Sequence, residues 1–216
     1  MGSGFRSAAT VRLNSTSAPD IVATNVSVGS VSQMSCSFNL SGKAVGDYYV
    51  IVTNDDGQSN SPSSGAMFTV EYPYPSITSI EPPMGSNTNT ALACSIAGNY
   101  FRPNATVKFT RSGYADILAT GEQVINPNTL NFTVNLSGRA PGDWNVVVRN
   151  DDSKAMVLLA GFKVLPPAPV PDFTATPVYG TVPLTVKFTD NSLNNPIQYA
   201  WNFGDGTILV GLAGTE

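Results

Sequence analysis

The chain has 216 residues, with 11 Lys or Arg, 15 Asp or Glu, and no His. Its net charge is slightly negative and no run of like charge reaches three residues, which argues against a nucleic-acid or acidic-membrane surface. The lack of histidine excludes Ser-His-Asp and Cys-His catalysis and imidazole zinc sites. No apolar run approaches the ~20 residues needed to cross a bilayer.

The sequence is a tandem repeat with a spacing of 96 positions. Residues 39–56 read NLSGKAVGDYYVIVTNDD, and residues 135–152 read NLSGRAPGDWNVVVRNDD. Each copy predicts a strand, a turn containing glycine, a second strand and an Asn-Asp-Asp turn. Such self-similarity predicts two structural units of one type.

Apolar residues alternate with polar ones throughout each copy. In the second copy Ala105, Val107 and Phe109 share one side, and Leu130, Phe132, Val134 and Leu136 do the same further along. Alternation with a period of two predicts half-buried antiparallel strands. No segment has helical spacing, and Gly and Pro recur between the strands, so we expect an all-β sandwich fold.

The two copies differ at their beginnings. Residues 75–98 precede the second copy and supply about two strands, whereas only residues 1–4 precede the first. We therefore expect an incomplete first sandwich over residues 1–72, with an open groove or exposed edge, and a complete sandwich over residues 73–166.

Residues 76–164 resemble a TIG (IPT) domain, which has an immunoglobulin-like fold. The motifs that carry the resemblance are ITSIEP at 77–82, IAGNYF at 96–101, GDWNVVV at 142–148 and GFKV at 161–164. Residues 5–70 resemble the same family without its first strands. The resemblance implies tandem immunoglobulin-like β-sandwich domains.

A proline-rich joint at 165–171 predicts a stiff extended spacer. After it, residues 172–207 resemble the beginning of a PKD domain through the signature Trp201, Phe203, Gly204, Asp205 and Gly206. We expect these five residues to be structural, with the Gly-Asp-Gly run forming a tight turn at positive φ. Residues 167–216 are expected to be an incomplete PKD-like sandwich, as in a fragment of a longer surface protein or after a shifted reading frame near residue 207.

Cys36 and Cys94 each alternate with apolar neighbours in different copies. We expect both to be buried free thiols; a disulfide between domains is the alternative, and would require both to reach a shared surface.

The carboxylates of the repeated turns are the one weak metal candidate. Asn54, Asp55, Asp56, Asn150, Asp151 and Asp152 could offer oxygen ligands to calcium, but their spacing matches no calcium loop. A solvated turn is the favoured interpretation. We expect no catalytic residue and no cofactor other than this calcium alternative.

Six Asn-x-Ser/Thr acceptor sites are candidates for glycosylation in a secreted glycoprotein: Asn14, Asn25, Asn39, Asn104, Asn131 and Asn135.

Two functions follow. The first is a non-catalytic structural or adhesion module at the cell surface or outside the cell, part of a rod of repeats in a surface-layer-like protein, with neighbouring modules, other surface proteins or polysaccharide as partners. The second is an accessory polysaccharide- or protein-binding region of a secreted hydrolase. A row of exposed aromatic side chains would favour the second, and its candidates are Tyr49, Tyr72, Tyr74 and Tyr114. Neither involves nucleic acid or membrane contact by this segment.

Overall fold

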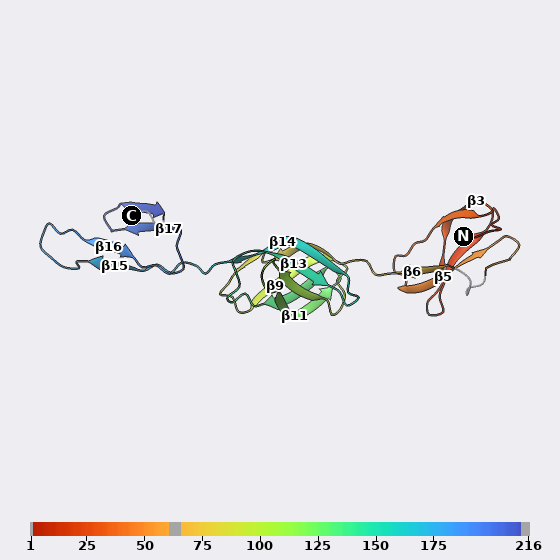
Figure 1. The fold of residues 1–216 in the computed structure, drawn as a ribbon, viewed down its shortest axis with the longest axis horizontal. Helices are drawn as coiled ribbons and strands as arrows, with labels where there is room; N and C mark the ends of the chain where they lie inside the picture. The colour runs from red at the N-terminus through yellow and green to blue at the C-terminus, as the bar shows by residue number, and fades with distance from the viewer. Residues whose placement is uncertain (1, 61–65, 213–216) are drawn as a thin grey trace. The chain divides into compact units, whose positions relative to one another are not determined.

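The computed structural model describes residues 2–60 and 66–212. These residues form strands, turns and loops and contain no helix, so the prediction of an all-β fold is confirmed. None of them forms a helix able to cross a membrane. The chain divides into two compact units, residues 1–73 and 74–216 (Figure 1).

The described residues of the first unit form six strands in two sheets. They are β1 (Thr10–Asn14), β2 (Ile21–Val22), β3 (Thr24–Ser30), β4 (Gln33–Ser37), β5 (Gly46–Thr53) and β6 (Met67–Val70). One sheet has the order β2-β1-β5-β6, and the other is the antiparallel pair β3-β4. Tyr48 of β5 is buried in a cluster with Leu13, Ile21 and Val70, and its hydroxyl donates a hydrogen bond to the Ala44 carbonyl at 2.9 Å.

The second unit begins with eight strands in one continuous order, β7-β9-β12-β11-β10-β13-β14-β8. Their bounds are β7 (Ser76–Glu81), β8 (Met84–Ser86), β9 (Leu92–Asn99), β10 (Thr106–Thr110), β11 (Ile117–Asn126), β12 (Thr129–Val134), β13 (Gly142–Arg149) and β14 (Ala155–Leu165).

This sheet curls until β7 lies against β14, so it nearly closes into a barrel. β11 makes the bend possible: Ile117 and Leu118 pair with β10, and from Ala119 onward the strand pairs with β12, with Gly121 at φ 66° inside the irregular stretch. A register shift at that point lets one strand serve both sides. The eight strands thus form one continuous sheet that folds over on itself around a shared core, which is consistent with the predicted β-sandwich fold.

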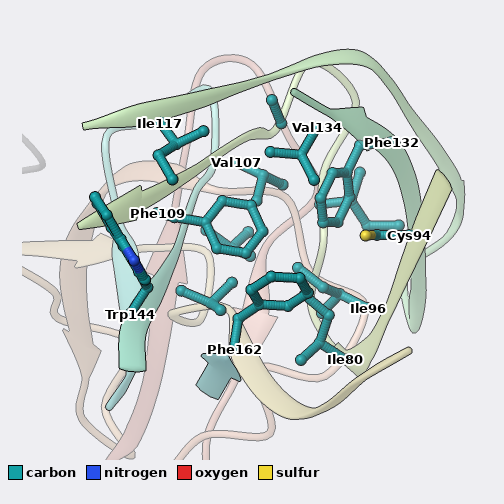
Figure 2. Packing of buried hydrophobic residues seen from close by; sticks show 14 of the residues in the cluster. Ile80, Cys94, Ile96, Val107, Phe109, Ile117, Phe132, Val134, Trp144 and Phe162 are labelled. Atoms are coloured by element: carbon teal, nitrogen blue, oxygen red, sulfur yellow. The ribbon is translucent and has the colours of Figure 1, made fainter. Parts of the chain in front are cut away.

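The core of β7–β14 contains 18 buried hydrophobic residues. Phe109 lies at its centre, with its ring 5.0 Å from that of Phe162 and 6.1 Å from that of Phe132, measured between centroids (Figure 2). Trp144 is 1% exposed and donates its indole N–H to the Ala140 carbonyl at 3.1 Å. Each buried side chain of this size contributes on the order of 1.5–3 kcal/mol by leaving water.

The tandem repeat is also a structural repeat. After a shift of 96 residues, β1 has the bounds of β10 and β5 has those of β13. Their pairing has the same register, since Thr10 lies opposite Thr53 and Thr106 lies opposite Arg149. Among the described residues, the first unit has no counterpart of β7, β8 and β9. Whether residues 1–72 are a sandwich that lacks its first strands stays a prediction.

Beyond the eight strands lie two antiparallel pairs. β15 (Phe173–Thr176) pairs with β16 (Lys187–Asp190), and β17 (Gln198–Asn202) pairs with β18 (Ile208–Leu212). No residue between 166 and 211 is buried. Whether residues 167–216 form a separate domain stays a prediction, and residues 213–216 lie outside the described part of the chain.

Both cysteines are free thiols. Cys94 is buried, as predicted, but Cys36 is only half-buried, so the prediction for Cys36 was wrong. The cause is the shorter first unit, because β9 covers the strand equivalent to that of Cys36 only in the second copy.

Candidate functional site

The Asn-Asp-Asp turn of the second unit fastens two distant parts of the chain. Asn150 is 3% exposed; its Nδ2 donates to the Tyr100 carbonyl at 2.8 Å, and its Oδ1 accepts from the Arg102 amide at 3.2 Å. The Arg102 guanidinium holds both oxygens of Asp151, at 2.6 and 3.2 Å. This contact lowers the pKa of Asp151 below its usual range.

The first unit repeats the arrangement. The Asn54 side chain donates to the Gly4 carbonyl at 2.9 Å and accepts from the Arg6 amide at 3.2 Å. The Arg6 guanidinium lies between Asp55 and Asp56, at 3.5 and 3.2 Å. A buried asparagine that bonds to two backbone groups satisfies donors and acceptors that would otherwise be unpaired.

These contacts decide what the six calcium candidates do in the fold. The two asparagines bind backbone, arginines hold Asp55, Asp56 and Asp151, and Asp152 accepts from the Lys154 amide at 3.1 Å. Asp152 Oδ2 is the remaining buried oxygen without a partner. Over residues 2–60 and 66–212, no three His, Cys, Asp or Glu side chains gather as a metal site. The arrangement fastens strand ends through ion pairs and hydrogen bonds.

The glycosylation candidates lie in different local settings. Asn25, Asn39, Asn104, Asn131 and Asn135 are exposed, and Asn14 is half-buried with its amide bonded to Asp20 at 2.8 Å. Asn39 and Asn135 repeat one geometry, since each accepts the amide proton of the serine two residues later, at 3.0 and 2.9 Å. In both residues it is the side-chain oxygen, and not the amide nitrogen, that takes part in this bond.

The Gly204-Asp205-Gly206 run forms a tight turn, as predicted. Gly204 and Gly206 have φ of 83° and 89°, a region that glycine enters without strain. Asp205 accepts from the backbone amide and the hydroxyl of Thr207 at 2.9 and 2.7 Å, and these bonds lower the pKa of its carboxyl. Asp205 is thereby held as a turn residue.

Trp201 and Phe203 line a cavity in the segment after residue 166. It measures about 430 Å³, and residues of β15, β16 and β17 contribute to its walls. The Trp201 ring packs edge-on against Phe173 at 5.6 Å and is stacked with Phe203 at 6.1 Å, while Phe188 lies 4.9 Å from Phe203. Phe173 is 57% exposed and Phe203 is 49% exposed, so aromatic surface faces solvent here.

Sequence reasoning looked for an aromatic row elsewhere. Of its four candidates, Tyr114 packs on Trp144 at 5.9 Å and Tyr74 lies under the Lys154 amine at 5.1 Å, while Tyr49 and Tyr72 are about two-fifths exposed. The cluster that does form joins Phe173 and Phe188 to the signature aromatics. The sequence held a signal for this cluster, because Tyr199, Trp201 and Phe203 occupy alternate positions along and just after β17. Phe188 in β16 was the other aromatic residue available to join them.

Comparison with protein-family models gives no match, and comparison with curated proteins gives none. One solved structure with a detectable likeness is SGBP-B of the Bacteroides ovatus mixed-linkage glucan utilization locus, in complex with a mixed-linkage heptasaccharide. The two chains are 15% identical with a TM-score of 0.28, and the alignment covers 75% of this chain and 39% of that one. The chain thus spans well under two thirds of that protein, and a TM-score of this size assigns neither fold nor ligand.

Proposed function

We propose that the chain is a non-catalytic module of an extracellular or cell-surface protein, built from repeated β units that space or display other parts. The main support is that the strand pair β1-β5 recurs as β10-β13 with the same register. In both copies an asparagine and an arginine at equivalent positions hold the ends of these strands. The conserved polar side chains of the repeat are thus engaged in holding backbone. The resemblance to TIG (IPT) and PKD domains supports the same proposal.

An extracellular setting is supported by the surface chemistry. Charged residues make up 12% of the chain, and the exposed surface is solvated largely by hydroxyl and amide groups, with five exposed Asn-x-Ser/Thr acceptors. Secretion from a glycosylating cell should therefore add glycan that a peptide-N-glycosidase removes, and Asn39→Gln with Asn135→Gln should remove two of the attachments.

The direct test of the non-catalytic proposal is a turnover assay with the purified chain. Chromogenic glycosides, esters and peptides should be released at the rate of buffer alone. Reproducible turnover that co-purifies with the chain and is lost when the chain is unfolded would overturn the proposal.

The aromatic cavity favours a second candidate function, glycan binding. Exposed aromatic faces offer apolar surface to the C–H face of a sugar ring, and the polar groups of Asp172, Asp190 and Asn202 lie on the same lining, where hydroxyl groups of a sugar would reach them. Such a lining suits a neutral pyranose chain, because aromatic contact supplies affinity and polar contact supplies orientation.

Trp201 makes this candidate measurable. The chain has two tryptophans, and Trp144 is buried in the core, so a saccharide that binds the cavity changes the emission of Trp201 alone. Soluble glucan, xylan and chitin oligosaccharides should give a saturable change that Trp201→Phe abolishes and Tyr114→Phe leaves intact. An unchanged spectrum with every saccharide would contradict glycan binding without touching the non-catalytic proposal.

A further inference from the structure

The first unit carries a groove of about 310 Å³ along β4. Its apolar lining includes Met34, Cys36, Phe38, Val50 and Val52, and no charged residue contributes to it. The groove is the open edge that the sequence predicts for residues 1–70. Its neutral, apolar walls favour a neutral, apolar occupant, because an ion would lose hydration there without a counter-charge.

The second copy of the repeat shows how the same surface is buried when it is complete. Met34 and Cys36 correspond to Leu130 and Phe132, which are 0% and 3% exposed. Val50 and Val52 correspond to Val146 and Val148, which are both 0% exposed. All four groove residues are only half-buried, although the strands that carry them are paired as in the second unit.

β9 is the strand that lies directly beside the equivalent of β4. β9 runs antiparallel to β12, with Ile96 opposite Leu130, Cys94 opposite Phe132 and Leu92 opposite Val134. The side chains of Cys94 and Ile96 belong to the core that also holds Phe132 (Figure 2). The part of the cover that borders β12 is therefore an extended segment with apolar side chains at alternate positions.

β4 has the free edge that such a segment needs. Over the described part of the first unit, β4 pairs with β3 and with no other strand. Its second edge presents backbone N–H and C=O groups to an incoming strand. A free edge beside an apolar groove is the arrangement used in recognition by strand addition, where backbone bonds give affinity and alternate side chains give specificity.

We propose that β4 is a docking edge for an extended segment of another protein. The segment lies antiparallel to β4, spans about six residues and places three apolar side chains at alternate positions into the groove, as Leu92, Cys94 and Ile96 do in the second unit. Gln33, Ser35 and Ser37 flank the edge on the exposed side of β4, so the outward residues of the segment are polar and uncharged. This inference does not depend on the function proposed above.

A second copy of the chain fits the groove less well. Two copies that pair through β4 are related by a two-fold axis perpendicular to the sheet, which turns both apolar faces to the same side. The dimer then extends the sheet and leaves each groove open. A separate segment, by contrast, can pair with the free edge of β4 and fill the groove at the same time.

The test uses the full chain and a synthetic peptide of residues 90–99 with Cys94→Ala. Cys36 lies in the groove and reports on it, because a bound strand covers its thiol. Saturating peptide should slow alkylation of Cys36 by roughly tenfold and protect the amides of β4 from hydrogen exchange. A peptide that also carries Leu92→Asp and Ile96→Asp is the matched control and should have no effect.

Two variants of the chain locate the binding. Met34→Lys places a charge in the groove and should abolish the effect of the peptide, whereas Ser35→Lys, on the exposed side of the same strand, should retain it. The proposal is overturned if the peptide leaves Cys36 and β4 unprotected, or if both peptides protect equally. It is also overturned if the amides of β4 become protected without peptide as the chain is concentrated, since that result means self-association through this edge.

Discussion

Residues 1–73 and the strands β7–β14 are two copies of one design that differ in how much of the core is closed. The complete copy buries 18 hydrophobic side chains, whereas the described part of the shorter copy buries seven. The bounds and register of β1 and β5 nevertheless match those of β10 and β13, and Asn54 and Asn150 make equivalent hydrogen bonds. The sheet and its fastening therefore form without the first strands, but burial of the second face depends on them.

Equivalent residues also keep equivalent partners. Arg12 pairs with Asp20 at 3.4 Å, and Lys108 pairs with Asp116 at 2.8 Å, one repeat later. Exposed pairs of this kind contribute little free energy. Their repetition shows that the pairs β1-β5 and β10-β13 position equivalent side chains in the same way. The strands without a counterpart in the described first unit therefore affect the packing against these pairs and not their local geometry.

The largest expected difference between the copies comes from one matched pair of core substitutions. Val146→Ala should lower the free energy of unfolding of the second unit by about 2–3 kcal/mol, because it leaves a cavity in a closed core. Val50→Ala, the same change at the equivalent half-buried position of the first unit, should cost about 1 kcal/mol. Hydrogen exchange measures each unit separately, and equal losses would contradict the contrast in burial.

The hydrogen bonds of Asn54 and Asn150 should show a smaller difference in stability between the two copies. Asn150→Ala leaves the Tyr100 carbonyl and the Arg102 amide without their partner in a buried setting, which should cost about 2 kcal/mol. Asn54→Ala removes the same bonds at a half-buried position and should cost about 1 kcal/mol. Urea unfolding of the two variants gives both values, and a larger loss for Asn54→Ala would reverse the proposed order.

The buried thiol of the complete copy should make its stability depend on pH. Burial raises the pKa of Cys94 from 9.0 to about 11. Because the unfolded chain releases this proton first, stability should fall as pH rises from about 9 to about 11. The fall should be reduced in Cys94→Ala, measured as the difference between the two melting curves at each pH.

The smallest effect is expected from the arginines of the turns. Arg102 is 23% exposed and grips one carboxylate with two nitrogens, whereas Arg6 is 56% exposed and divides its contacts between two carboxylates. Arg102→Gln should therefore lower the melting temperature more than Arg6→Gln. Both effects should shrink in ~1 M salt, where charges are screened over about 3 Å; persistence of either at high salt would mean that the charge is not its source.

Several strands and turns of the fold could be predicted from patterns within short stretches of the sequence. Alternation locates β1, β10, β5 and β13, and the gapless repeat makes their shared register expected. The positive φ of Gly204 and Gly206 follows from turn chemistry alone. These features depend on residues that are neighbours in the sequence, where side-chain spacing and backbone freedom are sufficient information.

Other features depend on pairing between distant segments and were missed. The near-closure of the second sheet requires β7 to lie against β14, and no local period encodes that contact. Arg102 was available as a signal, because Phe-Arg recurs at 5–6 and 101–102, but its grip on Asp151 depends on the fold bringing residues 49 positions apart together. The half-buried state of Cys36 likewise depends on a strand that the first copy does not have.

The parallel pairing of β8 with β14 sets how the complete copy responds to tension. Met84, Gly85 and Ser86 lie beside Lys163, Val164 and Leu165, next to the points where the chain enters and leaves these strands. If the two ends of the unit are pulled apart, we expect these parallel neighbours to be sheared past each other, so that the hydrogen bonds of the three residue pairs would carry the load as a group.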